Sequence, residues 1–142
     1  MSLTIDIADA VVAELVAGSF SQAFVPERRV LPEFDIADMH DLKVTVVPKA
    51  VEISGSSRSV CQYEVQVDIG IQKKLGTNLD VQVAELLDLV DEIADYLRRR
   101  VLQNTPWAVW LRTANDPIYA PDHIAQQRVF TSVLTLTYRA MK

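Results

Sequence analysis

Residues 60–73 read VCQYEVQVDIGIQK, and their side chains alternate between apolar and polar along almost the whole segment. The apolar positions share one parity: Cys61, Tyr63, Val65, Val67, Ile69 and Ile71. The positions between them carry acids and glutamines, with no positive charge before Lys73. A period of two over this length predicts a strand with one buried and one solvated face. At about 3.3 Å per residue it extends roughly 40 Å, so we expect it to project beyond its own domain.

Weaker patterns predict further extended segments on either side of this strand. Residues 42–47 alternate in the same way, and Pro48 is expected to end them because proline donates nothing to the ladder. Residues 107–113 carry a tryptophan on each face, and residues 127–140 form a second long strand with a threonine-rich face. Residues 21–34 contain two prolines, which predicts an edge strand or an extended arm.

Apolar residues at three- and four-residue spacing predict two amphipathic helices, at residues 5–17 and 80–102. Gly18 offers a left-handed residue that stops the first helix, and Pro106 follows the second. Few helices and locally paired strands favour an α+β fold. We expect an antiparallel or mixed sheet with long strands and two amphipathic helices packed on one face. With 142 residues and no linker or repeat, the chain is predicted to be a single domain over residues 1–142.

The composition narrows the class of protein. A formal net charge of −5 argues against nucleic-acid binding, because phosphate contacts need lysines and arginines that displace counterions. An acidic surface suits a channel through which DNA slides without sticking. The single cysteine, Cys61, excludes an internal disulfide. No charged segment precedes an apolar run, and no apolar stretch approaches about 18 residues. We therefore expect no signal peptide, no membrane span and a cytoplasmic place of synthesis.

No motif predicts a catalytic centre, a cofactor site or a metal site. Glycine occurs only four times, and no glycine-rich phosphate loop is present. His40 and His123 stand apart in predicted loops, which leaves too few converging ligands for a metal. The acids of the second helix are expected on its solvated face. We predict that the chain is not an enzyme, and a small enzyme using Cys61 or His123 is the distant alternative.

Three places in the sequence are candidates for a protein interface. They are the loop Asp116, Pro117, Ile118 and Tyr119, the arginines Arg98, Arg99 and Arg100, and Trp110. In the loop, proline lowers the cost of ordering the backbone on binding, and the aromatic ring supplies an anchor. The arginines suit an acidic neighbouring subunit, or salt bridges to acids one turn earlier. Of the two tryptophans, one is expected to face the core and the other a partner. Packing of the loop on its own domain is the open alternative.

Four segments, covering most of the chain by pattern, carry a resemblance to a known class of proteins. They are LKVTVVP at 42–48, YEVQVDIGIQKK at 63–74, the helix at 85–100, and residues 115–139. In size, element order and threonine-rich final strand, the chain resembles tail-terminator, tail-completion and neck proteins of long-tailed bacteriophages and prophages.

The resemblance implies a structural virion protein without catalytic residues or cofactors. Such proteins form a ring, commonly a hexamer, that caps the tail tube, stops tube-protein polymerisation and meets the head-side connector. DNA would pass through the lumen without specific binding. The implied location is the tail or neck of the virion, after assembly in the host cytoplasm. A head-completion or connector protein, or a tail-tube subunit, is the alternative.

Overall fold

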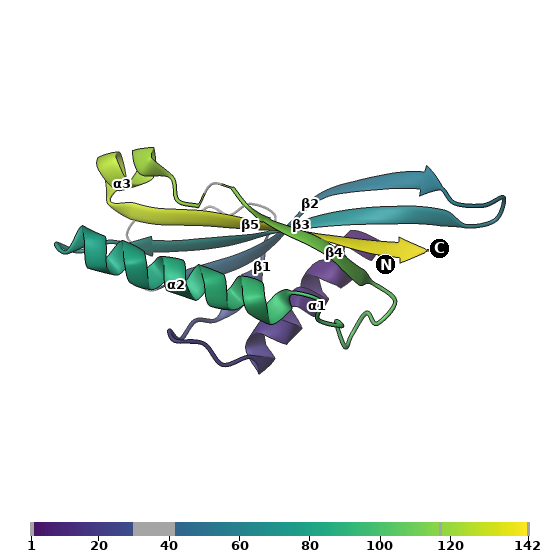
Figure 1. Ribbon diagram of the computed structural model, residues 1–142, viewed down its shortest axis with the longest axis horizontal. Coiled ribbons are helices and arrows are strands. Elements are labelled where there is room, and N and C mark those ends of the chain that lie inside the picture. The colour runs from purple at the N-terminus through teal and green to yellow at the C-terminus, as the bar shows by residue number, and fades with distance from the viewer. Residues whose placement is uncertain (1, 30–41, 117, 142) are drawn as a thin grey trace.

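The alternating segment forms β3 (Cys61–Lys74), the central strand of a five-stranded sheet in the order β1-β2-β3-β5-β4 (Figure 1). The computed structural model describes residues 2–29, 42–116 and 118–141. The other strands are β1 (Pro26–Arg28), β2 (Lys43–Gly55), β4 (Val109–Asn115) and β5 (Val129–Met141). The helices of the described residues are α1 (Leu3–Ala17), α2 (Leu79–Leu97) and α3 (Pro121–Gln127). β1 runs parallel to β2 and the remaining neighbours are antiparallel, so the α+β class with a mixed sheet is confirmed.

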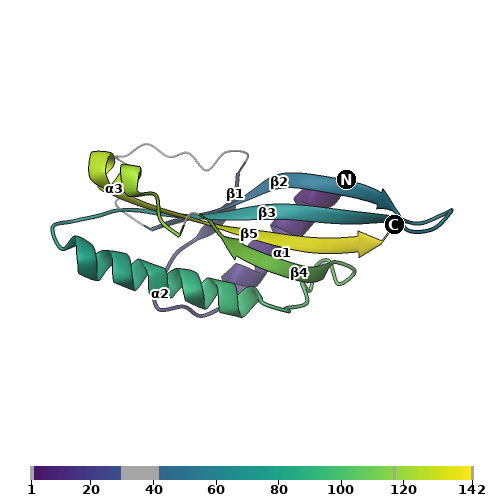
Figure 2. The ribbon, with the colours of Figure 1, turned by 45° about the horizontal axis from the view of Figure 1, so that its top comes forward.

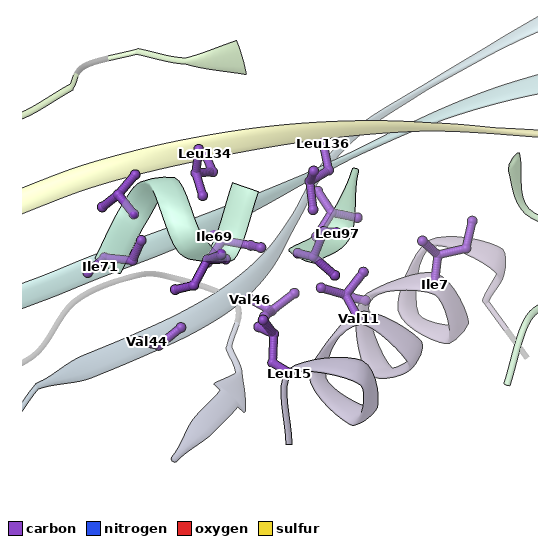
Figure 3. Close-up of a cluster of buried hydrophobic side chains, with 14 of the residues drawn as sticks. Ile7, Val11, Leu15, Val44, Val46, Ile69, Ile71, Leu97, Leu134 and Leu136 are labelled. Atoms are coloured by element: carbon purple, nitrogen blue, oxygen red, sulfur yellow. The ribbon is translucent and has the colours of Figure 1, made fainter. Parts of the chain in front are cut away.

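The apolar parity of β3 supplies the centre of the core. Val65, Val67, Ile69 and Ile71 are all fully buried. They share one hydrophobic cluster with side chains from α1, α2, β2 and β5, and Figure 3 shows the part around Val11, Val46 and Leu97. Burying one such side chain contributes roughly 1.5–3 kcal/mol. That the two long helices pack on one face of the sheet stays a prediction.

Pro48 does not end β2, contrary to expectation. The strand continues to Gly55, and its pairing with β3 shifts register between Pro48 and Ala50. Proline is tolerated here because β1 pairs with β2 only from Val44 to Val46, so that among the described residues no strand pairs with Pro48 on that side. The extra residue of the bulge, Lys49, absorbs the interruption.

Beyond the bulge, β2 and β3 form a hairpin that projects from the body of the molecule, as expected for so long a strand (Figures 1 and 2). Residues 49–59 are exposed throughout, and we call this segment the hairpin tip. It includes Val51 and Ile53, whose exposed fractions are 43% and 56%. The turn is closed by the backbone amides of Ser56 and Ser57, which both donate to the carbonyl of Val60.

The end of α2 and the start of β4 also differ from the predicted positions. α2 ends at Leu97 rather than near residue 102, and Arg99 follows in a left-handed conformation with φ of 58°. β4 begins at Val109, and a register shift between Trp110 and Arg112 reverses the expected alternation. β5 starts and ends close to the predicted bounds.

The turn-rich segment after β4 contains a helix that was predicted to be a loop. α3 begins at Pro121, where the missing N–H of proline costs nothing. It ends at Gln127, and Arg128 caps it in a left-handed conformation with φ of 53°. The edge-strand prediction for residues 21–34 holds for β1, whereas residues 30–41, including His40, lie outside the described residues.

We expect Ile69→Ala to lower the free energy of unfolding by about 2–5 kcal/mol, because it leaves a cavity at the centre of the sheet. Urea unfolding followed by circular dichroism measures the change. Val109→Ala, at a position that is 48% exposed on β4, is the control and should change stability by less than about 0.5 kcal/mol. Equal effects of the two substitutions would contradict this assignment of the core.

Candidate protein interface

The segment between β4 and α3 lies along β5 through backbone hydrogen bonds. The amide of Asp116 donates to the carbonyl of Val133 at 3.1 Å, and the amide of Ala120 donates to Thr131 at 3.0 Å. These two bonds tie both ends of the segment to β5. Ile118 and Tyr119 are 55% and 40% exposed there. Pro117 lies outside the described residues.

Tyr119 borders a shallow groove against the first turns of α2. The other lining residues are Leu79, Asp80, Val83, Ala84, Leu87 and Ile124, and we call this hollow the α2 groove. Leu79, Val83 and Leu87 recur every four residues and form one stripe of the helix, which is only half-buried. The fully buried stripe runs instead through Leu86, Val90, Ile93 and Leu97. That the loop forms an interface stays a prediction, and α2 contributes residues to the groove that the predicted interface did not include.

The three arginines after α2 have different environments. Arg98 and Arg99 are exposed. Arg100 instead contacts its own chain: its Nε donates to Oε2 of Glu14 at 2.9 Å, and its guanidinium lies 4.0 Å from the ring centroid of Tyr96. The acid partner is thus on α1 rather than one turn earlier on α2.

Glu14 is the centre of this contact. Its side chain is only 5% exposed, and its Oε1 accepts a second hydrogen bond from the amide of Gln103 at 2.9 Å. Burial raises the pKa of the Glu14 carboxyl, but the Gln103 amide and the bond and charge of Arg100 outweigh it, so the pKa lies below its ordinary value. The pKa of the buried Tyr138 hydroxyl is raised, mainly by burial and further by the charge of Glu14.

Trp110 is not the exposed tryptophan. It is partly buried against the core cluster, and its Nε1 donates to Oγ1 of Thr113 at 2.9 Å across the bulge in β4. Trp107 is 44% exposed and precedes the strand. One tryptophan thus faces the core, as the sequence predicts, and it is the candidate interface residue Trp110. That the exposed Trp107 faces a partner stays a prediction.

The structure does not gather the three candidate places into one surface. Tyr119 lies against the start of α2, whereas Arg98 follows its end. At about 1.5 Å per residue, the 19 residues of the helix separate these ends by roughly 28 Å.

The residues of the enzyme alternative are also far apart. Cys61 pairs with Gly55 at the outer end of the hairpin. His123 shares a hydrogen bond with Thr131 of β5, and Thr131 pairs with Gln72 near the other end of β3. Eleven steps of about 3.3 Å put the two ends of β3 roughly 35 Å apart, so they form no catalytic pair. Among the described residues, no group of three or more acids, histidines or cysteines is placed to hold a metal ion.

The polar face of the sheet is less acidic than its sequence indicates. Asp68 of β3 accepts a hydrogen bond from Thr135 at 2.6 Å and lies 4.0 Å from Lys49. Glu64 lies 3.8 Å from Arg112 of β4. Lys49 of β2 and Arg112 of β4 therefore supply cations near these two acids. Each such exposed pair is worth roughly 0–1 kcal/mol.

Comparisons with known proteins add no assignment. No family model matches the chain, and a search of curated proteins found no match. Within the described residues, no helix is long and apolar enough to cross a membrane.

We expect Glu14→Gln to destabilise the protein by about 1–3 kcal/mol at neutral pH, because charge-assisted hydrogen bonds are lost. A carboxyl with a lowered pKa contributes stability above its ordinary value of 4.5 and loses it as pH falls through the folded value. The difference between wild type and variant should therefore shrink in acid. Urea unfolding across pH measures it.

The matched control is Glu85→Gln, which removes a charge from the exposed face of α2. This variant should unfold with nearly wild-type stability at neutral pH. A difference between Glu14→Gln and wild type that stays constant down to strongly acidic pH would contradict the ion-pair account.

Proposed function

We propose that this chain is a structural virion protein of the ring-forming tail-terminator kind, which caps the tail tube of a long-tailed phage and joins it to the head-side connector. The observation that carries the proposal is the β2–β3 hairpin, whose outer part exposes Val51 and Ile53 to solvent. A small protein that keeps apolar side chains on a projecting arm has a surface suited to another protein. The sequence resemblance supports the same class.

A projecting arm suits a protein that ends the growth of a tube. A growing tube end is a heterologous interface that never closes on itself. A terminator matches that end on one side and presents a different surface on the other. Separated contact surfaces meet this requirement, and here the hairpin tip and the α2 groove belong to different elements.

The proposal includes partners but no chemistry. The partners are further copies of the chain in a ring, the tail-tube protein and the head-side connector. DNA would pass through the lumen without specific binding, for which a face of paired charges such as Glu64 with Arg112 is suitable. The proposed location is the virion neck or tail, after assembly in the host cytoplasm.

A second candidate function belongs to the same assembly class. A head-completion or connector protein, or a tail-tube subunit, would use a projecting hairpin equally well. A tube subunit polymerises into long tubes by itself, whereas a terminator forms closed rings, so electron microscopy of the purified protein separates the two. The distant enzyme alternative would need Cys61 and His123 to act separately, given their positions at opposite ends of β3.

We expect the purified protein to form one discrete ring-sized oligomer, or to form it when tail tubes are added. Light scattering coupled to size exclusion, across protein concentration and salt, measures the mass. A protein that stays monomeric at every concentration and ignores tubes would contradict the proposal.

Tyr119→Ala and the charge reversal Arg98→Glu with Arg99→Glu should each shift assembly to higher protein concentration if these places are interfaces. Arg100 is left intact because its bond to Glu14 belongs to the fold. The matched control is Trp107→Ala, an exposed aromatic outside the candidate places. Rings of wild-type size and stability in both variants would remove these residues from the interface.

A further inference from the structure

The hairpin tip carries an apolar strip with no covering element among the described residues. Val51 pairs with Val65 and Ile53 pairs with Tyr63, so both belong to the same row of the sheet as core residues nearer the body. They are nevertheless 43% and 56% exposed. The row that forms the core thus continues outward onto a solvent-exposed arm.

The α2 groove is the apolar hollow that could receive such a strip. Its lining includes the half-buried stripe of Leu79, Val83 and Leu87 together with Tyr119. Ala84 lies within it and leaves room, since its side chain is a single methyl group. An aromatic ring beside aliphatic side chains is the composition found at the centres of protein interfaces.

The two surfaces lie at opposite ends of the long axis. Figures 1 and 2 both show the β2–β3 turn at one end, and the start of α2 with α3 at the other. One copy therefore cannot join its own hairpin tip to its own groove. Contact between the surfaces therefore requires a second copy. A head-to-tail contact of this kind repeats from copy to copy and closes into a ring when the rotation between copies allows it.

Charge favours the same pairing. α2 contains six acids, Asp80, Glu85, Asp88, Asp91, Glu92 and Asp95, and no lysine or arginine. Arg58 is the only charged residue of the hairpin turn at 56–60, and it makes no ion pair within the described part of the chain. Asp80 lines the groove itself. The hairpin tip as a whole carries Lys49, Glu52 and Arg58, so two cations and one acid give it a net charge of +1, which is complementary to the acidic helix beside the groove.

We propose that the hairpin tip of one copy docks in the α2 groove of a second copy, with Val51 and Ile53 against the apolar stripe and Arg58 beside Asp80. This inference rests on the proposed ring function and names the contact that joins neighbouring subunits. It also assigns half of the contact to α2 residues outside the predicted interface.

The test uses two variants that each damage one surface. Ile53→Asp places a charge on the apolar strip, and Ala84→Gln fills the groove with a polar side chain. Each variant alone should assemble at least about tenfold more weakly than wild type, because anchor residues at interface centres carry most of the affinity. Analytical ultracentrifugation measures the assembly, and circular dichroism checks that both variants fold.

Mixing the variants distinguishes a head-to-tail contact from a symmetric one. The Ile53→Asp copy keeps an intact groove, and the Ala84→Gln copy keeps an intact hairpin tip. An equimolar mixture should therefore form a one-to-one heterodimer and stop there, since the remaining two surfaces are both damaged. A mixture that contains only monomers would overturn the proposal.

The matched controls place the same changes on other surfaces. Val16→Asp places the charge on an exposed apolar residue of α1, and Ala13→Gln enlarges an exposed alanine on the same helix. Both should assemble like wild type. If Ile53→Asp and Ala84→Gln also form wild-type rings, the contact is overturned while the proposed ring function stands. A wild-type chain that is monomeric with or without tubes overturns both.

A charge exchange tests the polar part of the contact. Arg58→Glu should weaken assembly several-fold, and the addition of Asp80→Arg should restore much of the loss. Asp80→Arg alone should also weaken assembly. Independent, additive losses in the double variant would remove Arg58 and Asp80 from a shared contact.

Discussion

Burial of one face of β3 is the constraint on which the rest of the structure depends. A single row of the strand holds Val65, Val67, Ile69 and Ile71. A shift of the pairing register by one residue would expose all four side chains to water. β2 and β5 pair with this strand along nearly its whole length, so both inherit its register. The side chains of α1 and α2 then complete the same cluster. One alternating segment thus fixes the positions of its neighbours.

The same row produces both the core and the exposed arm. β2 and β3 keep their pairing beyond the part that the body of the molecule buries, and Val51 and Ile53 follow from the alternation without any change of pattern. An open edge with apolar residues is an aggregation hazard. Pro48 and the bulge at Lys49 interrupt the edge of β2 just beyond its pairing with β1. Regular pairing of another strand with this edge is therefore restricted to the residues beyond the bulge. The arm is therefore protected in part against aggregation, while its outer residues can still contact another protein.

A buried carboxylate links segments that are distant in sequence. Glu14 of α1 binds Arg100 and the Gln103 amide, which fixes the chain that leads from α2 to β4. This contact ties the chain after α2 to α1, while the Arg100 side chain stays 37% exposed. With its buried stripe held inward, α2 presents the stripe of Leu79, Val83 and Leu87 beside Tyr119.

The sequence by itself determined the α+β class, the long alternating strands, the projection of β3 and the exposure of Tyr119, because periodicity and turn chemistry are local properties. It did not determine that β2 passes Pro48, that Arg100 pairs with Glu14, or that Trp110 is the inner tryptophan. Those outcomes depend on which strand lies at an edge, where a bulge falls and which distant acid meets a cation. The α2 groove was likewise decided only by tertiary structure, since one apolar stripe looks like another until packing buries one and leaves the next beside Tyr119.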